Sequence, residues 1–508
     1  MGRQLILQVK VSISGLDLTQ DIGPIIRSFF PRDEIVTEVN KSEKEADSTL
    51  DVTDTGYRID LNLEESGFSI YSDGEKKAEE IFSYEDIPDE HMSYEKRKKR
   101  AYKNQLLRAL YKVLSVKTGK ELPWGILTGV RPTKLMFEKL KNGDKADTSF
   151  MEKEYLCSTK KAGLSLKVAQ REFELLKNID YVNGYSLYVG FPFCPSICNY
   201  CSFGSMLIDR SGTLVSDYIN ALLKETEEMS GILKDKKLQT VYFGGGTPTA
   251  VSLEQLRSVI RKVKDCFDMS NVLEFTVEAG RPDSIDEEKL KMLKEEGITR
   301  ISINPQSMRQ KTLDIIGRKH TVEQTVEAFC LARKTGFDNI NMDLIAGLSG
   351  ECFSDMEYTL NEVGKLEPDS ITVHTLALKR AAKLVTEKEM YSNLRASDVG
   401  EMVEYAADYC MARGYEPYYL YRQKKMTENL ENIGYARTGK EGLYNILIME
   451  EVQMILALGA GASSKFTDKN RTNGRRFGRV ENVKNVSEYI GRIDEMIERK
   501  KNAYNEGF

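Results

Sequence analysis

The chain has 508 residues, and its 73 basic and 78 acidic side chains give a formal net charge of −5 at pH 7. This near balance argues against a general nucleic-acid binder, and no uncharged apolar run is long enough to predict a membrane span. We expect a cytoplasmic protein, because Lys10 interrupts the short apolar start and eight cysteines occur without a predicted export signal. The length predicts about three domains.

The first predicted region, residues 1–180, has an α+β pattern whose role the sequence does not indicate. Apolar residues alternate over Leu5–Ile13 as in a half-buried strand, and two more strand-like runs lie within Tyr57–Tyr71. The acidic, polar segment Pro31–Thr55 is expected to be a loop. A helix is predicted over Ser93–Thr118, and the basic residues in its first turns are interpreted as a solvated face.

A loop rich in glycine and proline follows at Leu122–Pro132 and contains the single tryptophan, Trp124. Glycine and proline at this density predict a structured turn. The loop is either a packing hinge or a flap whose Arg131 meets a carboxylate, and its sequence does not choose between these roles.

Three cysteines, Cys194, Cys198 and Cys201, lie in one short loop with the pattern C-x3-C-x2-C. Thiolates at this spacing bind a soft metal centre or take part in redox chemistry. A zinc site usually shows a second Cys/His pair, a disulfide is unexpected without an export signal, and inert core cysteines seldom cluster in such a loop. We therefore predict a [4Fe–4S] cluster, which normally takes four cysteines, so three leave one iron open to another ligand.

Strand–loop–helix repeats define a second predicted region, residues 181–380. The predicted strands are Ser186–Phe191, Leu238–Phe243, Leu273–Val277, Arg300–Ile303, Ile340–Leu344 and Ser370–Leu376. The predicted helices are Val215–Leu233, Leu253–Phe267, Asp286–Glu296, Val322–Thr335 and Ser354–Leu366. Strands that alternate with helices imply a parallel sheet. Six such units predict an α/β fold with an incomplete (β/α)6 barrel.

Polar or glycine-rich residues occur at the ends of these predicted strands, where barrel enzymes place their reacting groups. They are the cysteine loop, Gly244-Gly245-Gly246-Thr247, Glu278, Gln306, Asp343 and the stretch from His374 to Ala377. Buried polar groups need partners, so several of them at one rim indicate a polar ligand. The glycines allow close approach to the backbone, but the motif lacks the Lys-Ser/Thr of a phosphate loop.

The third predicted region, residues 381–508, contains the aromatic and basic stretch Tyr415–Lys425. Aromatic rings with nearby cations suit a flat apolar ligand edged with carboxylates, in which case Tyr421, Arg422 and Lys424 contact substrate. A core strand followed by a solvated loop has the same pattern.

Two further segments of this region can be interpreted from their residue types. The small residues of Leu458–Ser464 either pack a helix against a strand or form a wall against a large planar substrate. A charged final helix, from about Val486, is expected only to cap the fold.

The cysteine pattern, with an aromatic residue before its last cysteine, resembles the radical S-adenosylmethionine (SAM) superfamily. Tyr188 with Phe193-Cys194, Tyr200–Phe203, Gly244–Thr249 and Gly317–His320 are similar to one family, the oxygen-independent coproporphyrinogen III oxidases and their haem-chaperone relatives. The HemZ-type coproporphyrinogen dehydrogenase branch is the most similar. The resemblance implies a radical SAM barrel with an N-terminal α+β domain and a C-terminal α+β substrate-side domain.

The resemblance also implies a role for each matching residue. Cys194, Cys198 and Cys201 would each bind one iron, and SAM would bind the fourth. Around SAM, the family's positions place Tyr188 beside the sulfonium and Arg318 at the carboxylate. The amino group would lie against Gly244, Gly245, Gly246 and Thr247, and the ribose and amino-acid moiety against Glu278, Gln306 and Asp343. The adenine would contact Phe203, Thr375 and Ala377. Phe203 and Gly190 stand where the oxidase branch has cysteine and histidine, and both changes are shared with the chaperone or HemZ-type branches.

This resemblance implies a radical SAM oxidoreductase of haem biosynthesis. A 5′-deoxyadenosyl radical would take hydrogen from the propionates of coproporphyrinogen III, and loss of carbon dioxide and an electron would give the vinyl groups of protoporphyrinogen IX. A haem-binding chaperone, or another radical-dependent tetrapyrrole reaction, is the alternative. Haem iron prefers a His, Cys, Met or Tyr ligand, and the chain has three histidines, which favours the iron-free substrate. A donor such as flavodoxin or ferredoxin is the expected partner.

Overall fold

The computed structural model describes residues 8–31, 33–40, 56–81, 93–201, 204–208, 212–376, 396–422, 430–467 and 477–507. These residues form two compact units. Of the described residues, the N-terminal unit holds those up to Leu166 together with Arg422 and Leu430, and the barrel unit holds the others. No described helix combines the length and the apolar character needed to cross a lipid bilayer.

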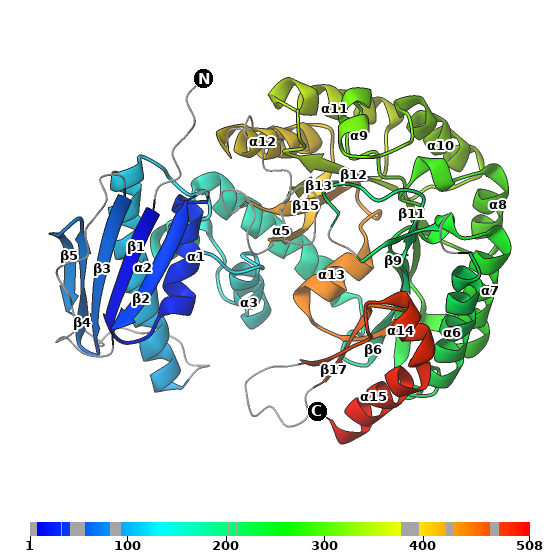
Figure 1. Ribbon diagram of the computed structural model, residues 1–508, viewed down its shortest axis with the longest axis horizontal. Coiled ribbons are helices and arrows are strands. Elements are labelled where there is room, and N and C mark those ends of the chain that lie inside the picture. The colour runs from blue at the N-terminus through cyan, green and yellow to red at the C-terminus, as the bar shows by residue number, and fades with distance from the viewer. Residues whose placement is uncertain are drawn as a thin grey trace. The chain divides into compact units, whose positions relative to one another are not determined.

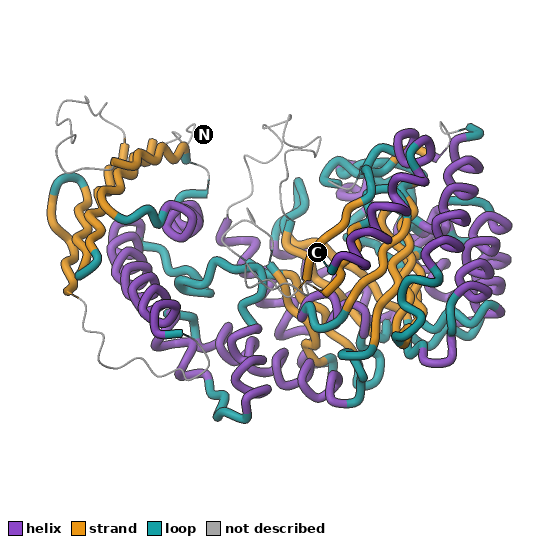
Figure 2. The backbone as a smooth tube through the Cα atoms, turned by 90° about the horizontal axis from the view of Figure 1, so that it is seen from below, coloured by secondary structure: helices purple, strands orange, loops and turns teal. Residues whose placement is uncertain are grey.

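The N-terminal unit is built on a five-stranded sheet with the order β2-β1-β3-β4-β5. Its strands are β1 (Gln8–Gly15), β2 (Glu34–Asn40), β3 (Gly56–Glu64), β4 (Gly67–Ser72) and β5 (Glu75–Ile81). Its helices are α1 (Thr19–Phe29), α2 (Tyr94–Thr118), α3 (Lys134–Asn142) and α4 (Thr148–Tyr155), and α5 (Thr159–Lys177) continues into the barrel unit. Helices α1 and α2 cover one face of the sheet, where Val9, Val11 and Ile13 are buried (Figure 2).

The prediction of a loop over Pro31–Thr55 is wrong for its first part. Glu34–Asn40 forms β2 and pairs in parallel with β1. None of its residues from Glu34 to Val39 is buried, so this edge strand lacks the alternating burial by which a strand is recognised in sequence. Residues 41–55 lie outside the described part of the chain.

The barrel unit is organised by one sheet of eleven strands. Its centre consists of six parallel strands, in spatial order β6 (Gly184–Phe191), β9 (Lys237–Gly245), β10 (Glu274–Glu278), β11 (Arg300–Ser302), β12 (Ile340–Ala346) and β13 (Ser370–Thr375). Beyond β6 lie β16 (Met454–Leu458), β17 (Ser463–Thr467) and β18 (Phe477–Glu481), and beyond β13 lie β15 (Asn432–Ala436) and β14 (Glu416–Tyr421). A separate pair, β7 (Phe193–Cys194) and β8 (Met206–Leu207), forms in the cysteine loop.

The central strands confirm the predicted incomplete (β/α)6 barrel. Strands β6 and β13 pair with the flanking strands β16 and β15, so the sheet stays open. The strands are buried along nearly their whole length, as expected when helices cover a parallel sheet. The five helices predicted between the strands are observed within a few residues of their expected bounds.

The helices of the barrel unit lie mainly along the outer side of this sheet (Figure 1). They are α6 (Leu214–Met229), α7 (Leu253–Cys266), α8 (Glu287–Glu295), α9 (Gln310–Ile315), α10 (Val322–Lys334), α11 (Phe353–Leu366), α12 (Ala396–Ala412), α13 (Leu443–Glu450), α14 (Val486–Gly491) and α15 (Ile493–Glu506). Helices α7 and α10 begin with capping boxes at Ser252 and Thr321. In each, the hydroxyl of the capping residue accepts a hydrogen bond from the backbone amide of a glutamine three residues on, and the glutamine side chain accepts from the backbone amide of the capping residue.

The compact units divide the chain differently from the three predicted regions. Residues after 381 group with the barrel unit because β14–β18 extend its sheet. The boundary between units falls within α5, at Leu166, and not near residue 180. The three predicted regions therefore stay a prediction.

Candidate active site

The cysteine loop follows β6 and is fastened to the segment that ends α9. The backbone and side-chain nitrogens of Asn199 donate to the carbonyls of Ile316 and Ile315, both at 2.9 Å. The hydroxyl of Ser196 donates to the carbonyl of Gly317 at 3.1 Å. Helix α9 was absent from the predicted elements, although the carbonyls at its end accept the hydrogen bonds that hold the cysteine loop in place.

The three cysteines of this loop differ in exposure. Cys198 is buried, whereas Cys194 and Cys201 are half-buried. Burial raises the pKa of the Cys194 thiol, so a bound cation is what would favour its thiolate. Within the described residues, no group of three His, Cys, Asp or Glu side chains is placed to hold a single metal ion. An iron–sulfur cluster distributes its cysteines over different irons, so its ligands lie farther apart.

The glycine motif at the end of β9 packs tightly against β6 and the cysteine loop. The amides of Gly246 and Thr247 donate to the carbonyls of Phe191 and Phe193, each at 2.7 Å. A Cβ on Gly246 would lie 2.6 Å from the Phe191 oxygen, and Gly245 has a φ of +103°. The motif therefore requires glycine for the chain's own packing, apart from any ligand.

A stack of tyrosine rings lies beside this motif. Tyr188 and Tyr242 face each other on β6 and β9 with ring centroids 6.2 Å apart, and the Tyr242 and Tyr444 centroids are 4.5 Å apart. The hydroxyl of Tyr242 donates to the Glu278 carboxylate. Burial raises the pKa of Glu278 to about 7, and the nearby Asp343 charge acts in the same direction. This carboxyl therefore titrates near neutral pH.

Gln306, in the segment after β11, meets Asp343 on β12. The amide of Gln306, which has a φ of +68°, donates to the Asp343 carbonyl at 2.9 Å. Asp343 lies within β12 and not at its end, because the buried residues after it continue the strand to Ala346. Burial alone would raise the pKa of Asp343, but a hydrogen bond and the charge of His374 lower it. The His374 Nε2 atom lies 3.7 Å from the Asp343 carboxylate.

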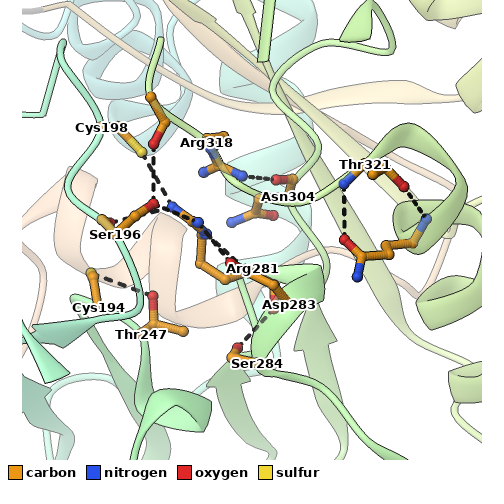
Figure 3. Close-up of polar contacts among 12 residues, drawn as sticks. Cys194, Ser196, Cys198, Thr247, Arg281, Asp283, Ser284, Asn304, Arg318 and Thr321 are labelled. Carbon is orange, nitrogen blue, oxygen red and sulfur yellow. Dashed lines mark hydrogen bonds and ion pairs between the residues drawn. The ribbon is translucent and has the colours of Figure 1, made fainter. Parts of the chain in front are cut away.

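Arg318 reaches back toward the cysteine loop from the segment after α9. Its guanidinium donates to the Asn304 carbonyl (Figure 3). It also interacts with Tyr200 and Cys198. The side chain is 7% exposed. Its Nε atom, and the side-chain oxygen of Gln306, are buried with no hydrogen-bond partner among the described residues. Buried polar atoms are almost always paired, so these two indicate space for a polar ligand.

Residues 188–363 match the Radical SAM superfamily. The chain is 42% identical over 392 residues to the oxygen-independent coproporphyrinogen-III oxidase-like protein HemZ of Bacillus subtilis. The aligned residues cover 76% of this chain and 78% of that protein. The chain belongs to the HemZ-type branch of the radical SAM superfamily. It is also 32% identical over 290 residues to the haem chaperone HemW of Bacillus subtilis, covering 54% of this chain and 70% of that one.

Solved structures agree with the fold. Coproporphyrinogen III oxidase (HemN) from Escherichia coli, described as a radical SAM enzyme, superposes with a TM-score of 0.51 and 20% identity, covering 62% of this chain and 70% of that one. Membership of the radical SAM superfamily gives the HemZ-type chain its cofactors, a [4Fe–4S] cluster and SAM. The unpartnered atoms of Gln306 and Arg318 fit a polar cofactor of this kind.

The predicted SAM contacts are partly brought together. Tyr188, Glu278 and the glycines lie side by side, as do Gln306 and Asp343. Thr375 is 3% exposed and its hydroxyl donates to the Glu431 carbonyl at 2.7 Å, so its polar atoms join β13 to the chain before β15. Phe203 and Ala377 lie outside the described residues.

The structure describes two of the three predicted substrate contacts, Tyr421 and Arg422. The Tyr421 hydroxyl lies 3.5 Å from His374 Nδ1, within the barrel unit. Arg422 belongs to the N-terminal unit, where it is 3% exposed, donates to the Leu127 carbonyl and lies over Trp124. This burial does not support a contact with substrate, and Lys424 lies outside the described residues.

Sequence reasoning missed several residues of the site. Tyr242 pairs with Tyr188 across β6 and β9, so a comparison of strand register would have found it. Arg281 lies three residues beyond Glu278, and its contacts with the cysteine loop join segments far apart in the sequence. No sequence pattern at Arg281 indicates this contact. The small residues at Gly459 serve packing, since a Cβ there would lie 2.6 Å from the Tyr218 hydroxyl.

Proposed function

We propose that this chain is a cytoplasmic radical SAM oxidoreductase that decarboxylates propionates of coproporphyrinogen III to the vinyl groups of protoporphyrinogen IX. The observation that carries this proposal is the 42% identity over 392 residues to a protein named as oxygen-independent coproporphyrinogen-III oxidase-like. All eight cysteines are free, which supports a reducing compartment.

Cys194, Cys198 and Cys201 are assigned as the three cluster ligands, since they lie in one loop supported by α9. When bound, the reduced cluster and SAM would supply a 5′-deoxyadenosyl radical, which would take a hydrogen atom from a propionate; carbon dioxide would then leave, and an external one-electron acceptor would take the remaining electron. The chain's task is to hold the reacting groups and to exclude water. We further propose an external one-electron donor of the flavodoxin or ferredoxin class.

The polar residues at the rim are assigned to SAM by their chemistry. Arg318 is a buried cation beside Cys198 with an unpartnered Nε, which suits the SAM carboxylate. Glu278, Gln306 and Asp343 present oxygen acceptors, which suit the ribose hydroxyls and the amino group. Tyr188, held by the tyrosine stack, lies against Gly245 and is assigned to the sulfonium side.

The aromatic wall near His374 supports a flat substrate. Tyr419 and Tyr421 stack with centroids 6.2 Å apart and an angle of 9° between their rings. His374 lies between Tyr421 and Asp343, so this wall adjoins the residues assigned to SAM. Aromatic faces of this kind suit a tetrapyrrole ring.

A haem chaperone is the second candidate, favoured by the 32% identity to HemW. Of the three histidines, His320 is fully buried, His374 is engaged with Asp343, and His91 lies outside the described residues. Burial therefore closes His320 to a haem iron, whereas His374 is half-buried and already contacts a carboxylate.

Anaerobic turnover tests the proposal. The reconstituted chain is incubated with SAM, a reductant and coproporphyrinogen III, and the tetrapyrrole and nucleoside products are identified by mass. We expect protoporphyrinogen IX and 5′-deoxyadenosine, both lost in Cys198→Ala. Cleavage of SAM with intact propionates would overturn the decarboxylase assignment, and tight binding of haemin by the same sample would then favour the chaperone.

A further inference from the structure

Arg281 joins the loop after β10 to the cysteine loop through its guanidinium. The side chain is 3% exposed. Its Nη2 atom donates to the Ser196 hydroxyl at 2.7 Å, and Nη1 donates to the Ser196 carbonyl at 3.3 Å. The same Nη1 atom donates to the Cys198 sulfur at 3.6 Å (Figure 3). A permanent positive charge is thus buried against an assigned cluster ligand.

The other side of the guanidinium is held by Asp283. Nε and Nη2 donate to the two carboxylate oxygens at 3.0 and 2.9 Å. The five N–H groups of an arginine are therefore all occupied, by Ser196, Cys198 and Asp283. Arg281 has no donor left for substrate or SAM, in contrast to Arg318, whose Nε has no partner in the described part of the chain.

We propose that Arg281 sets the reduction potential of the cluster by holding a positive charge and an N–H donor against the Cys198 thiolate. This inference rests on the proposed assignment of Cys198 as a ligand. Reduction adds one negative charge to a cluster, and the electron comes from the external donor. A nearby cation and an N–H···S bond stabilise the reduced form more than the oxidised form, which raises the potential. Because the site is buried, the interaction is weakly screened.

Asp283 moderates this effect. Its carboxylate lies on the far side of the guanidinium from Cys198, so it partly cancels the positive charge that the cluster experiences. Removing Arg281 and removing the Asp283 charge should therefore shift the potential in opposite directions. If Arg281 only fastens the loop, loss of either member of the pair loosens it in the same way.

Redox titration of the full chain tests the proposal. Wild type and variants are reconstituted anaerobically, titrated with dithionite against mediators, and followed by the electron paramagnetic resonance signal of the reduced cluster, with iron and sulfide measured in each sample. In Arg281→Met we expect the ratio of reduced to oxidised cluster at a fixed potential to fall roughly tenfold, which is about 59 mV for one electron. Arg281→Lys, which keeps the charge, should shift less.

Asp283→Asn supplies the opposite arm, because it keeps Arg281 and should raise the potential. Arg333→Met is the matched control, since Arg333 pairs with Asp369 at the amino ends of the strands, and it should leave the potential unchanged. An unchanged potential in Arg281→Met with full iron content would overturn the proposal. If Arg281→Met assembles no cluster, the test is the direction of the change in reduction potential in Asp283→Asn. A lower or unchanged potential in Asp283→Asn would then overturn the proposal. A wild-type chain that binds no cluster would instead refute the proposed function.

Discussion

The buried ion pair between Glu225 on α6 and Lys500 on α15 should be decisive for stability. Both side chains are fully buried. The Glu225 carboxylate also accepts from the Gly459 amide at 2.8 Å, from Asn482 at 2.9 Å and from the Tyr489 hydroxyl at 2.6 Å. Burial alone would raise the pKa of Glu225, but the Lys500 charge and the hydrogen bonds from Lys500, Tyr489 and Gly459 lower it. The carboxylate is therefore ionised in the folded chain.

Lys500→Met removes the only cation that the described residues place in contact with this carboxylate. Loss of one member of a buried ion pair costs about 3–5 kcal/mol. Because three neutral donors remain, we expect about 3 kcal/mol, the lower end of that range. The affected network holds the turn at Gly459, which packs on Gly190 beside Tyr188. The loss of stability should therefore also loosen the start of the cysteine loop.

Urea unfolding of the chain, followed by circular dichroism, measures the change in unfolding free energy. Lys501→Met is the matched control, one residue along the same helix, because Lys501 pairs with Glu228 at the surface and exposed pairs contribute little. The double variant Glu225→Gln/Lys500→Met should lose less than the sum of the single losses, since it removes both charges. Equal midpoints for Lys500→Met and Lys501→Met, or additive losses in the double variant, would refute the reasoning.

Three further predictions concern the proposed SAM site. Because the pKa of Glu278 is about 7, its ionised fraction rises from about one-tenth at pH 6 to about nine-tenths at pH 8. The affinity for SAM, measured by calorimetry, should rise over this interval, and this pH dependence should be lost in Glu278→Gln. Tyr242→Phe removes a hydrogen bond that lowers this pKa, so the midpoint of the affinity profile should move to higher pH, and a downward shift would contradict the assignment. Gly246→Ala should lower the iron content of the reconstituted protein several-fold, because its Cβ would lie 2.6 Å from the Phe191 oxygen, whereas Gly163→Ala, in open space, should not.

Much of the barrel could be predicted from sequence because its signals are local. Ser186–Phe191 has no charged residue, Ile340–Leu344 alternates apolar with polar residues, and the helices between the strands repeat with their own period. Strand ends in such a barrel converge on one rim, so Glu278 and Gln306 could be named before their positions were known. The spacing of the three cysteines likewise predicted an iron–sulfur cluster from a short stretch of sequence.

The N-terminal strand β2 and helix α9 could not be predicted in the same way. Glu34–Asn40 is an exposed edge, and Gln310–Ile315 has only six residues, so neither shows a clear period. Both are stabilised by tertiary contacts, β2 by pairing with β1 and α9 by packing that includes Leu313. Short elements depend on such packing more than on their own propensity.

By itself, the sequence determined the parallel barrel, the cysteine loop and the residue types available at its rim, because these follow from periodicity and spacing along the chain. Only the tertiary structure decided which charges meet. Lys500, in a helix expected merely to cap the fold, is buried against Glu225, and Arg281 is buried against Cys198. The partners in these pairs are separated by 275 and 83 residues, and burial of a charge depends on what the fold places around it. No local sequence pattern indicates contacts between residues so far apart in the chain.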